Sequence, residues 1–88
     1  MTSIGPVWPR VRALAGEEFR QKGGKPFTYV AHENYIELQT TNRNISRTAM
    51  ATALERVPLK GPGDVQDLSA PSYIYGILMD ERVSEGAW

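Results

Sequence analysis

The sequence contains no cysteine among its 88 residues. This absence excludes disulfide bonds, thiolate metal ligands and a thiol nucleophile. It is typical of proteins in a reducing compartment, and we therefore expect a cytoplasmic location. Long apolar runs are missing too, because no stretch approaches the roughly 20 residues that a membrane-spanning helix needs. The N-terminal stretch also lacks the apolar segment of a secretory signal, so we expect no membrane partner.

The common catalytic motifs are also missing, since the sequence has no P-loop, no G-x-S-x-G elbow and no H-E-x-x-H pair. The acidic residues show no spacing that identifies a catalytic pair. His32 is the only histidine, and it has no cysteine partners. We therefore expect a protein that is not an enzyme and that holds no metal ion or other cofactor.

The net charge is formally zero, which argues against strong non-specific binding to nucleic acid. The two signs are nevertheless distributed unevenly along the chain. Up to Arg47 there are seven basic and four acidic residues, and after Arg47 there are three basic and six acidic residues. The first part of the chain is therefore the better candidate for contact with an anionic partner.

The residues that are present predict one small α+β domain that spans residues 1–88. The hydrophobic share of 41% and the charged share of 23% are ordinary for a globular protein. The clearest element is an amphipathic helix over residues 46–57, in which Met50, Ala53, Leu54 and Val57 recur at helical spacing. Ser46 is its predicted N-cap, and Pro58 stops it.

A short helix over residues 6–15, ended by Gly16, is predicted before a three-stranded antiparallel meander. The predicted strands are residues 17–21, 26–32 and 35–40, with turns at Gly23-Gly24 and Glu33-Asn34. An alternative continues the first helix through residues 17–21. We prefer the strand because Gly16 would weaken a helix interior by about 1 kcal/mol.

One or two helices are predicted after the central one. Residues 59–64 form a rigid connector, residues 65–68 are predicted to form a helical turn capped by Asp64, and residues 71–81 form the last helix. A strand over residues 72–80 is the alternative, because β-branched and aromatic residues dominate that segment. We expect residues 1–5 and 84–88 to be flexible.

The first candidate site is a basic surface. Helix N-termini attract anions, and basic residues there oppose the helix dipole unless an anion lies nearby. Basic residues also gather around the Gly-Gly turn. The candidate residues for nucleic-acid or anion binding are Arg20, Lys22, Lys25, Arg43, Asn44, Ser46 and Arg47. The alternative is a capped helix start and a turn with solvated basic side chains.

The second candidate site is a protein interface on the last helix and the chain end. It comprises Tyr73, Tyr75, Met79 and Trp88, of types that are enriched at interface cores. The alternative is that these side chains close the core over the sheet. Two hypotheses follow: a small nucleic-acid-binding domain, and a protein-interaction module or small subunit whose partner is another protein or a second copy of the chain.

Overall fold

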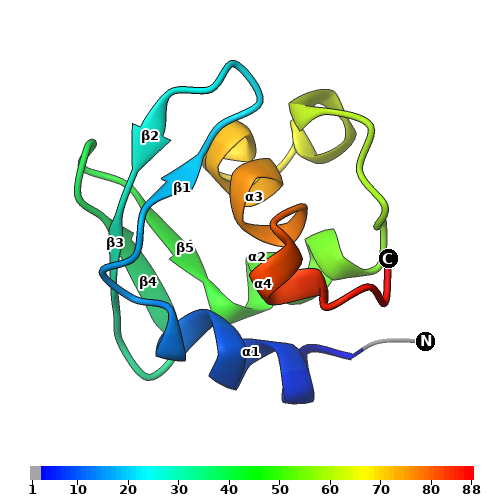
Figure 1. The fold of residues 1–88 in the computed structure, drawn as a ribbon, viewed down its shortest axis with the longest axis horizontal. Helices are drawn as coiled ribbons and strands as arrows, with labels where there is room; N and C mark the ends of the chain where they lie inside the picture. Colours follow the sequence, from blue (N-terminus) through cyan, green and yellow to red (C-terminus); the bar gives the residue numbers. More distant parts are fainter. Residues whose placement is uncertain (1–2) are drawn as a thin grey trace.

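The computed structural model describes residues 3–88. In chain order the elements are helix α1 (Ile4–Ala13), strands β1 (Phe19–Arg20), β2 (Pro26–Phe27), β3 (Tyr29–Ala31), β4 (Tyr35–Leu38) and β5 (Asn44–Ser46), helix α2 (Arg47–Leu54), the 3-10 helix η1 (Pro62–Val65), and helices α3 (Pro71–Leu78) and α4 (Glu81–Ser84). The α+β class is confirmed. Figure 1 shows the strands on the left, α3 near the centre, α4 just below it and α1 along the bottom.

The core lies between the inner face of the three-stranded sheet and the helices. The inward side chains of the sheet are Tyr29, Ile36, Leu38 and Ile45, each no more than 2% exposed. They belong to one apolar cluster that also takes in buried side chains of α1, α2 and α3. The opposite face of the sheet is solvated, as expected for an antiparallel sheet that packs on one side.

The prediction of which segments form the meander is wrong, although the sheet does have three strands that pair in antiparallel fashion. The three-stranded sheet has the order β3-β4-β5, and β1 and β2 form a separate two-stranded ribbon. Phe19 is paired with Phe27, so residues 17–21 contribute strand rather than helix. Gly16, at φ 89°, lies before the ribbon, and its N–H donates to Tyr29 O at 3.0 Å.

The third strand of the sheet is β5, which lies between the predicted meander and the predicted central helix. In β5, Ile45 is buried while Asn44 and Ser46 are exposed, which is the alternation of a half-buried strand. Ile45 pairs with Ile36 on β4. Strand β4 needs a second neighbour for the backbone groups that point away from β3, and β5 supplies it.

The central helix begins as predicted and ends earlier. The Ser46 hydroxyl accepts a hydrogen bond from Ala49 N at 3.0 Å, which confirms the N-cap. The helix ends at Leu54 rather than at Val57. The next N–H groups, of Glu55 and Arg56, bond three residues back instead of four, and Pro58 has no N–H to continue the ladder.

The last predicted helix is two helices. Its alternative, a strand over residues 72–80, is wrong, because α3 runs from Pro71 to Leu78. Asp80 then starts α4 as an N-cap, with its carboxylate accepting from Arg82 N at 2.9 Å. The predicted turn at residues 65–68 begins earlier, as η1, and Asp64 lies within it rather than before it.

The first helix begins at Ile4 and ends at Ala13, two residues earlier at each end than predicted. Of the segment expected to be flexible at the beginning of the chain, residues 1 and 2 lie outside the described residues. At the other end, the Trp88 indole N–H donates to Leu78 O at 2.6 Å. The end of the chain therefore lies against the end of α3.

Candidate nucleic-acid interface

The turn between β1 and β2 carries two lysines and is braced by an arginine. Gln21 N donates to Lys25 O at 3.0 Å, and Gly24 N donates to Gln21 O at 2.8 Å. Gly24 supplies the positive φ of 90° that this geometry requires. The Arg20 guanidinium donates to Gly24 O at 2.9 Å. Lys22 and Lys25 are exposed on the resulting turn.

A third lysine joins this turn from a distant part of the chain. Lys22 Nζ donates to Lys60 O at 3.3 Å, so the turn lies against the connector before η1. Lys60 N in turn donates to the Asp64 carboxylate at 2.8 Å, which holds the connector in place. We call the group formed by Lys22, Lys25 and Lys60 the basic tip. Sequence analysis missed Lys60, because its 38-residue separation from Lys22 carries no local signal.

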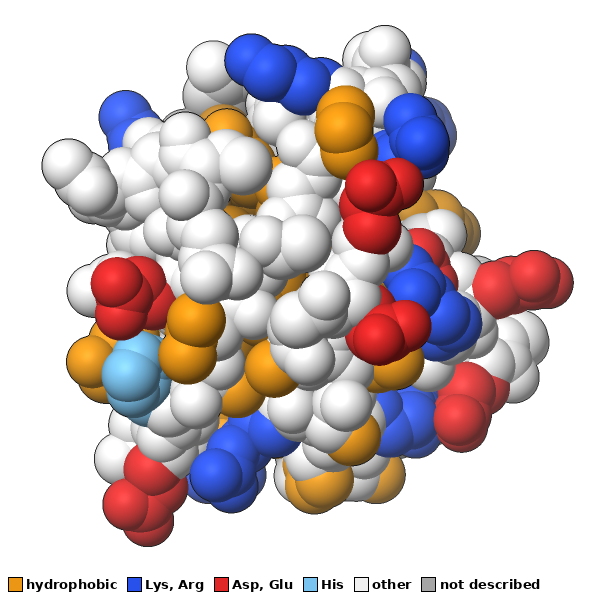
Figure 2. All heavy atoms as spheres, turned by 60° about the vertical axis from the view of Figure 1, so that its left-hand side comes forward, with side chains coloured by type: hydrophobic (Ala, Val, Ile, Leu, Met, Phe, Trp, Pro, Cys, Tyr) orange, Lys and Arg blue, Asp and Glu red, His pale blue; other side chains and the backbone are white. Residues whose placement is uncertain are grey.

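The basic tip differs from other basic groups in its ion pairing. Within residues 3–88, the arginines that lie within 4.0 Å of a carboxylate oxygen are Arg10, Arg20, Arg56 and Arg82. Within the same residues, none of the lysines of the basic tip has such a partner, and neither do Arg12, Arg43 and Arg47. In Figure 2 the Lys and Arg side chains form separate groups, and acidic side chains lie beside several of them.

The predicted residues at the start of the central helix are spread along β5 and its two ends. Leu38 N donates to Arg43 O at one end of β5, and Arg47 N donates to Asn34 O at the other end. Arg43 therefore lies at the end of the sheet nearer to Thr28 and β2, and Arg47 lies beside the β3–β4 turn. Asn44 and Ser46 lie between them on the exposed side of β5.

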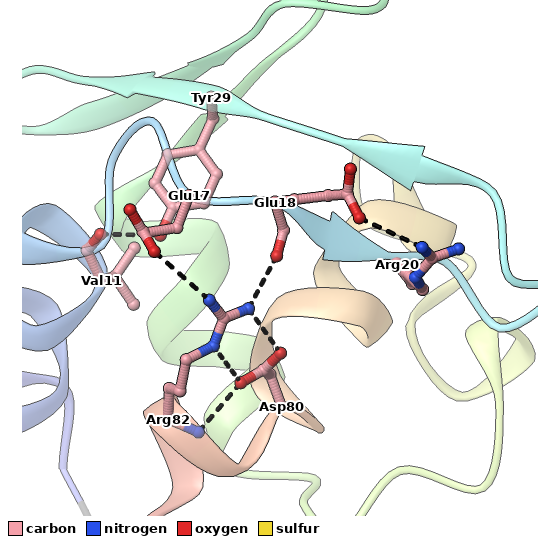
Figure 3. Close-up of polar contacts among 7 residues, drawn as sticks. All are labelled: Val11, Glu17, Glu18, Arg20, Tyr29, Asp80 and Arg82. Atoms are coloured by element: carbon pink, nitrogen blue, oxygen red, sulfur yellow. Dashed lines mark hydrogen bonds and ion pairs between the residues drawn. The ribbon is translucent and has the colours of Figure 1, made fainter.

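The Arg20 guanidinium already has polar partners within this chain. Its guanidinium lies 3.1 Å from the Glu18 carboxylate and also holds the turn. Arg20 therefore positions the basic tip more than it adds free charge to it. A nearby polar cluster, shown in Figure 3, has the Arg82 guanidinium between the Glu17 carboxylate, the Glu18 carbonyl and the Asp80 carboxylate.

The Arg82 cluster is saturated by internal contacts. The guanidinium makes two hydrogen bonds of 2.9 Å with Asp80 and lies 4.4 Å from the centre of the Phe19 ring. The hydrogen bond from Arg82 holds the pKa of the Asp80 carboxyl below its usual range. A hollow of about 330 Å³ lies beside this cluster, but each of its four charged side chains already has a partner of opposite charge. Its geometry indicates a structural role.

The aromatic and methionine side chains proposed as a protein interface are half-buried and pack on the core. Tyr73 meets Phe27 edge to face, with the ring centres 4.9 Å apart. Met79 Sδ accepts from Leu59 N at 3.3 Å, and Trp88 contacts Leu78 as described above. Tyr75 lies beside the hollow near Arg82. These contacts are those of side chains that close the core.

His32 lies on the solvated side of the sheet with two neighbours. Its Nε2 lies 3.1 Å from the Glu37 carboxylate, and its ring stacks on Tyr35 with the centres 4.4 Å apart. Across residues 3–88, no group of three or more histidine or acidic side chains is placed to hold a metal ion.

Comparisons of the chain with protein-family models, with curated proteins and with solved structures gave no match. In the part of the chain that the structure describes, no helix is both long enough and apolar enough to cross a membrane.

Proposed function

We propose that this protein is a small, non-enzymatic nucleic-acid-binding domain whose basic tip contacts phosphates. The observation that carries the proposal is the contact of the Lys22 ammonium with the Lys60 carbonyl, which brings two lysine-bearing segments together; among residues 3–88 no carboxylate lies within 4.0 Å of the ammonium groups of Lys22, Lys25 or Lys60. Lysines without a carboxylate partner on two adjoining segments attract a phosphodiester backbone, which releases its own counterions on binding.

The geometry of the basic tip suits a sequence-independent contact. Lysine ammonium groups act as point charges and recognise phosphate without the directional fork of arginine. Contacts with phosphates position a protein on nucleic acid but do not read bases. Because the whole chain has no net charge, we expect modest affinity that depends on local rather than overall charge.

The salt dependence follows from the number of cations. Three phosphate contacts predict that the logarithm of the binding constant falls with the logarithm of the salt concentration at a slope of about −2 to −3. The experiment is a fluorescence anisotropy titration of labelled random duplex and single-stranded DNA at several salt concentrations.

The decisive variant replaces Lys22, Lys25 and Lys60 with glutamine, which removes the charge. The introduced amide at position 22 also retains a hydrogen-bond donor in place of the Lys22 ammonium. We expect binding at low salt to weaken about tenfold or more. The matched control is Arg12→Gln, which removes an exposed, unpaired charge from α1. Binding that ignores salt, or a triple variant that binds like the original chain, contradicts the proposal.

A further inference from the structure

Strand β5 lies at the open edge of the three-stranded sheet. Its hydrogen bonds with β4 involve alternate residues: Leu38 N donates to Arg43 O, and Arg47 N donates to Asn34 O. In an antiparallel ladder this alternation directs the backbone of Arg43, Ile45 and Arg47 toward β4. The backbone groups of Asn44 and Ser46 therefore point away from the sheet.

Three of these outward groups are free to bond to another strand. The Ser46 carbonyl is not free, because the carbonyl of an N-cap residue accepts the first hydrogen bond of its helix. The N–H and carbonyl of Asn44 and the N–H of Ser46 have no hydrogen-bond partner within residues 3–88. Both residues are exposed, so another chain has access to this edge. Exposed edges of this kind are where extended segments add to a sheet.

The edge is flanked by positive charge at both ends. Arg43 and Arg47 are exposed and lie roughly 13 Å apart along the strand, at about 3.3 Å per residue. Within the described part of the chain, neither has a carboxylate within 4.0 Å. Glu37, opposite Asn44 on β4, is engaged by His32 at 3.1 Å. An occupant that carries negative charge at the same spacing therefore complements this edge.

The same charges disfavour a second copy of this chain as the occupant. Two β5 edges related by a two-fold axis pair in antiparallel fashion, and in one such register they are centred on Ile45. Arg43 of one copy then lies opposite Arg47 of the other, and like charges directly opposite one another destabilise a sheet.

We propose that β5 binds an extended acidic segment of a partner protein as an additional antiparallel strand. Backbone hydrogen bonds to Asn44 and Ser46 hold the segment, and two carboxylates four residues apart contact Arg43 and Arg47. This inference does not depend on the proposed nucleic-acid function, since it uses none of the residues of the basic tip.

The probe is a capped peptide with the sequence Thr-Glu-Val-Thr-Val-Glu-Thr, and its matched control has lysine in place of both glutamates. We expect the acidic peptide alone to shift the amide resonances of Asn44 and Ser46 in a heteronuclear NMR titration and to slow their hydrogen exchange. Equal binding of the two peptides, or shifts that map to the basic tip, overturns the proposal.

A pair of variants at one position tests the backbone contact. Asn44→Pro removes an N–H that the native sheet does not use, and proline is tolerated on edge strands with this orientation. We expect it to abolish binding of the acidic peptide while the thermal unfolding midpoint stays close to the original. Asn44→Thr keeps the N–H and retains binding. If Asn44→Pro binds normally, or if Asn44→Thr fails to bind while folded, the proposal is wrong.

A second pair of variants tests the charges without changing the backbone. Arg43→Gln with Arg47→Gln is expected to weaken acidic-peptide binding about tenfold, and Arg12→Gln is expected to leave it unchanged. Reversal to glutamate at Arg43 and Arg47 is expected to switch the preference to the lysine peptide. Two results contradict the inference. The first is a concentration-dependent shift of the Asn44 amide resonance without peptide, which indicates self-association. The second is a variant with Arg43→Gln and Arg47→Gln that loses DNA binding but keeps peptide binding.

Discussion

Tyr29 is the largest side chain that the core buries completely, and its hydroxyl replaces a missing backbone hydrogen bond. Val11 lies near the end of α1, where Ala15 N donates to Arg12 O instead of to Val11 O. The Tyr29 hydroxyl donates to Val11 O at 2.7 Å and so satisfies this carbonyl. Burial raises the pKa of Tyr29, because the phenolate is poorly solvated in the core.

We predict that Tyr29→Phe lowers the free energy of unfolding by about 1–2 kcal/mol, because the Val11 carbonyl is left buried without a partner. The pH dependence should also change. Above pH of about 10 the unfolded state ionises Tyr29 while the folded state keeps it neutral, so the original chain loses stability there. Tyr29→Phe lacks this contribution. Denaturant unfolding at neutral and alkaline pH measures both effects, with Tyr35→Phe on the solvated face as the control.

At the scale of elements, the contact between α3 and β1 depends on a glycine inside a helix. A side chain at Gly76 would place its Cβ 2.5 Å from Arg20 O and 3.0 Å from the Phe27 ring. The nearer atom belongs to the backbone of β1, which cannot turn aside as a flexible side chain can. Gly76 therefore lets α3 approach the β1–β2 ribbon that carries the basic tip.

We predict that Gly76→Ala destabilises the fold by about 1–3 kcal/mol, because overpacking outweighs the gain of about 1 kcal/mol in helix propensity. The control is Gly63→Ala in η1, where an added Cβ meets no atom within 4 Å. Thermal unfolding followed by circular dichroism compares the two variants. A Gly76→Ala midpoint at or above that of the original chain would show that α3 does not need this close approach.

Across the whole molecule, distant side chains satisfy the ends of short helices. Tyr29 serves the end of α1, Trp88 donates to Leu78 O at the end of α3, and Arg10 donates to Val83 O of α4 at 2.6 and 3.0 Å. Arg10 also lies 3.4 Å from the Glu85 carboxylate. Helices this short are marginal alone, so tertiary contacts at their ends carry much of their stability.

We predict that Arg10→Met, which keeps an unbranched side chain but loses the donors, lowers the free energy of unfolding by about 1–3 kcal/mol. Hydrogen exchange should accelerate first in residues 81–88, which lose their tie to α1. Arg12→Met removes an exposed arginine of the same helix and is expected to have little effect. Equal exchange rates at the chain end in both variants would refute the role of Arg10.

Local patterns in the sequence predicted the α+β class, the N-cap at Ser46, the end of the first helix before Gly16 and the helical state of α3. Each depends on interactions within a few residues, such as a side-chain oxygen near an amide or a glycine that adopts positive φ. The same local rules also located the Gly-Gly turn and its two lysines.

Tertiary structure decided which strands pair and which distant segments lie in contact. Ile45 alternates with exposed neighbours, but three residues are too few to predict a strand, and only pairing with Ile36 makes β5 one. Lys60 joins Lys22 through a bond across the chain, and Arg43 and Arg47 separate because β5 extends between them. The sequence by itself determined local conformation and the residues available for binding. Only the packing of distant segments determined which charges meet and which sheet edge stays open, because those outcomes depend on contacts that sequence neighbours do not share.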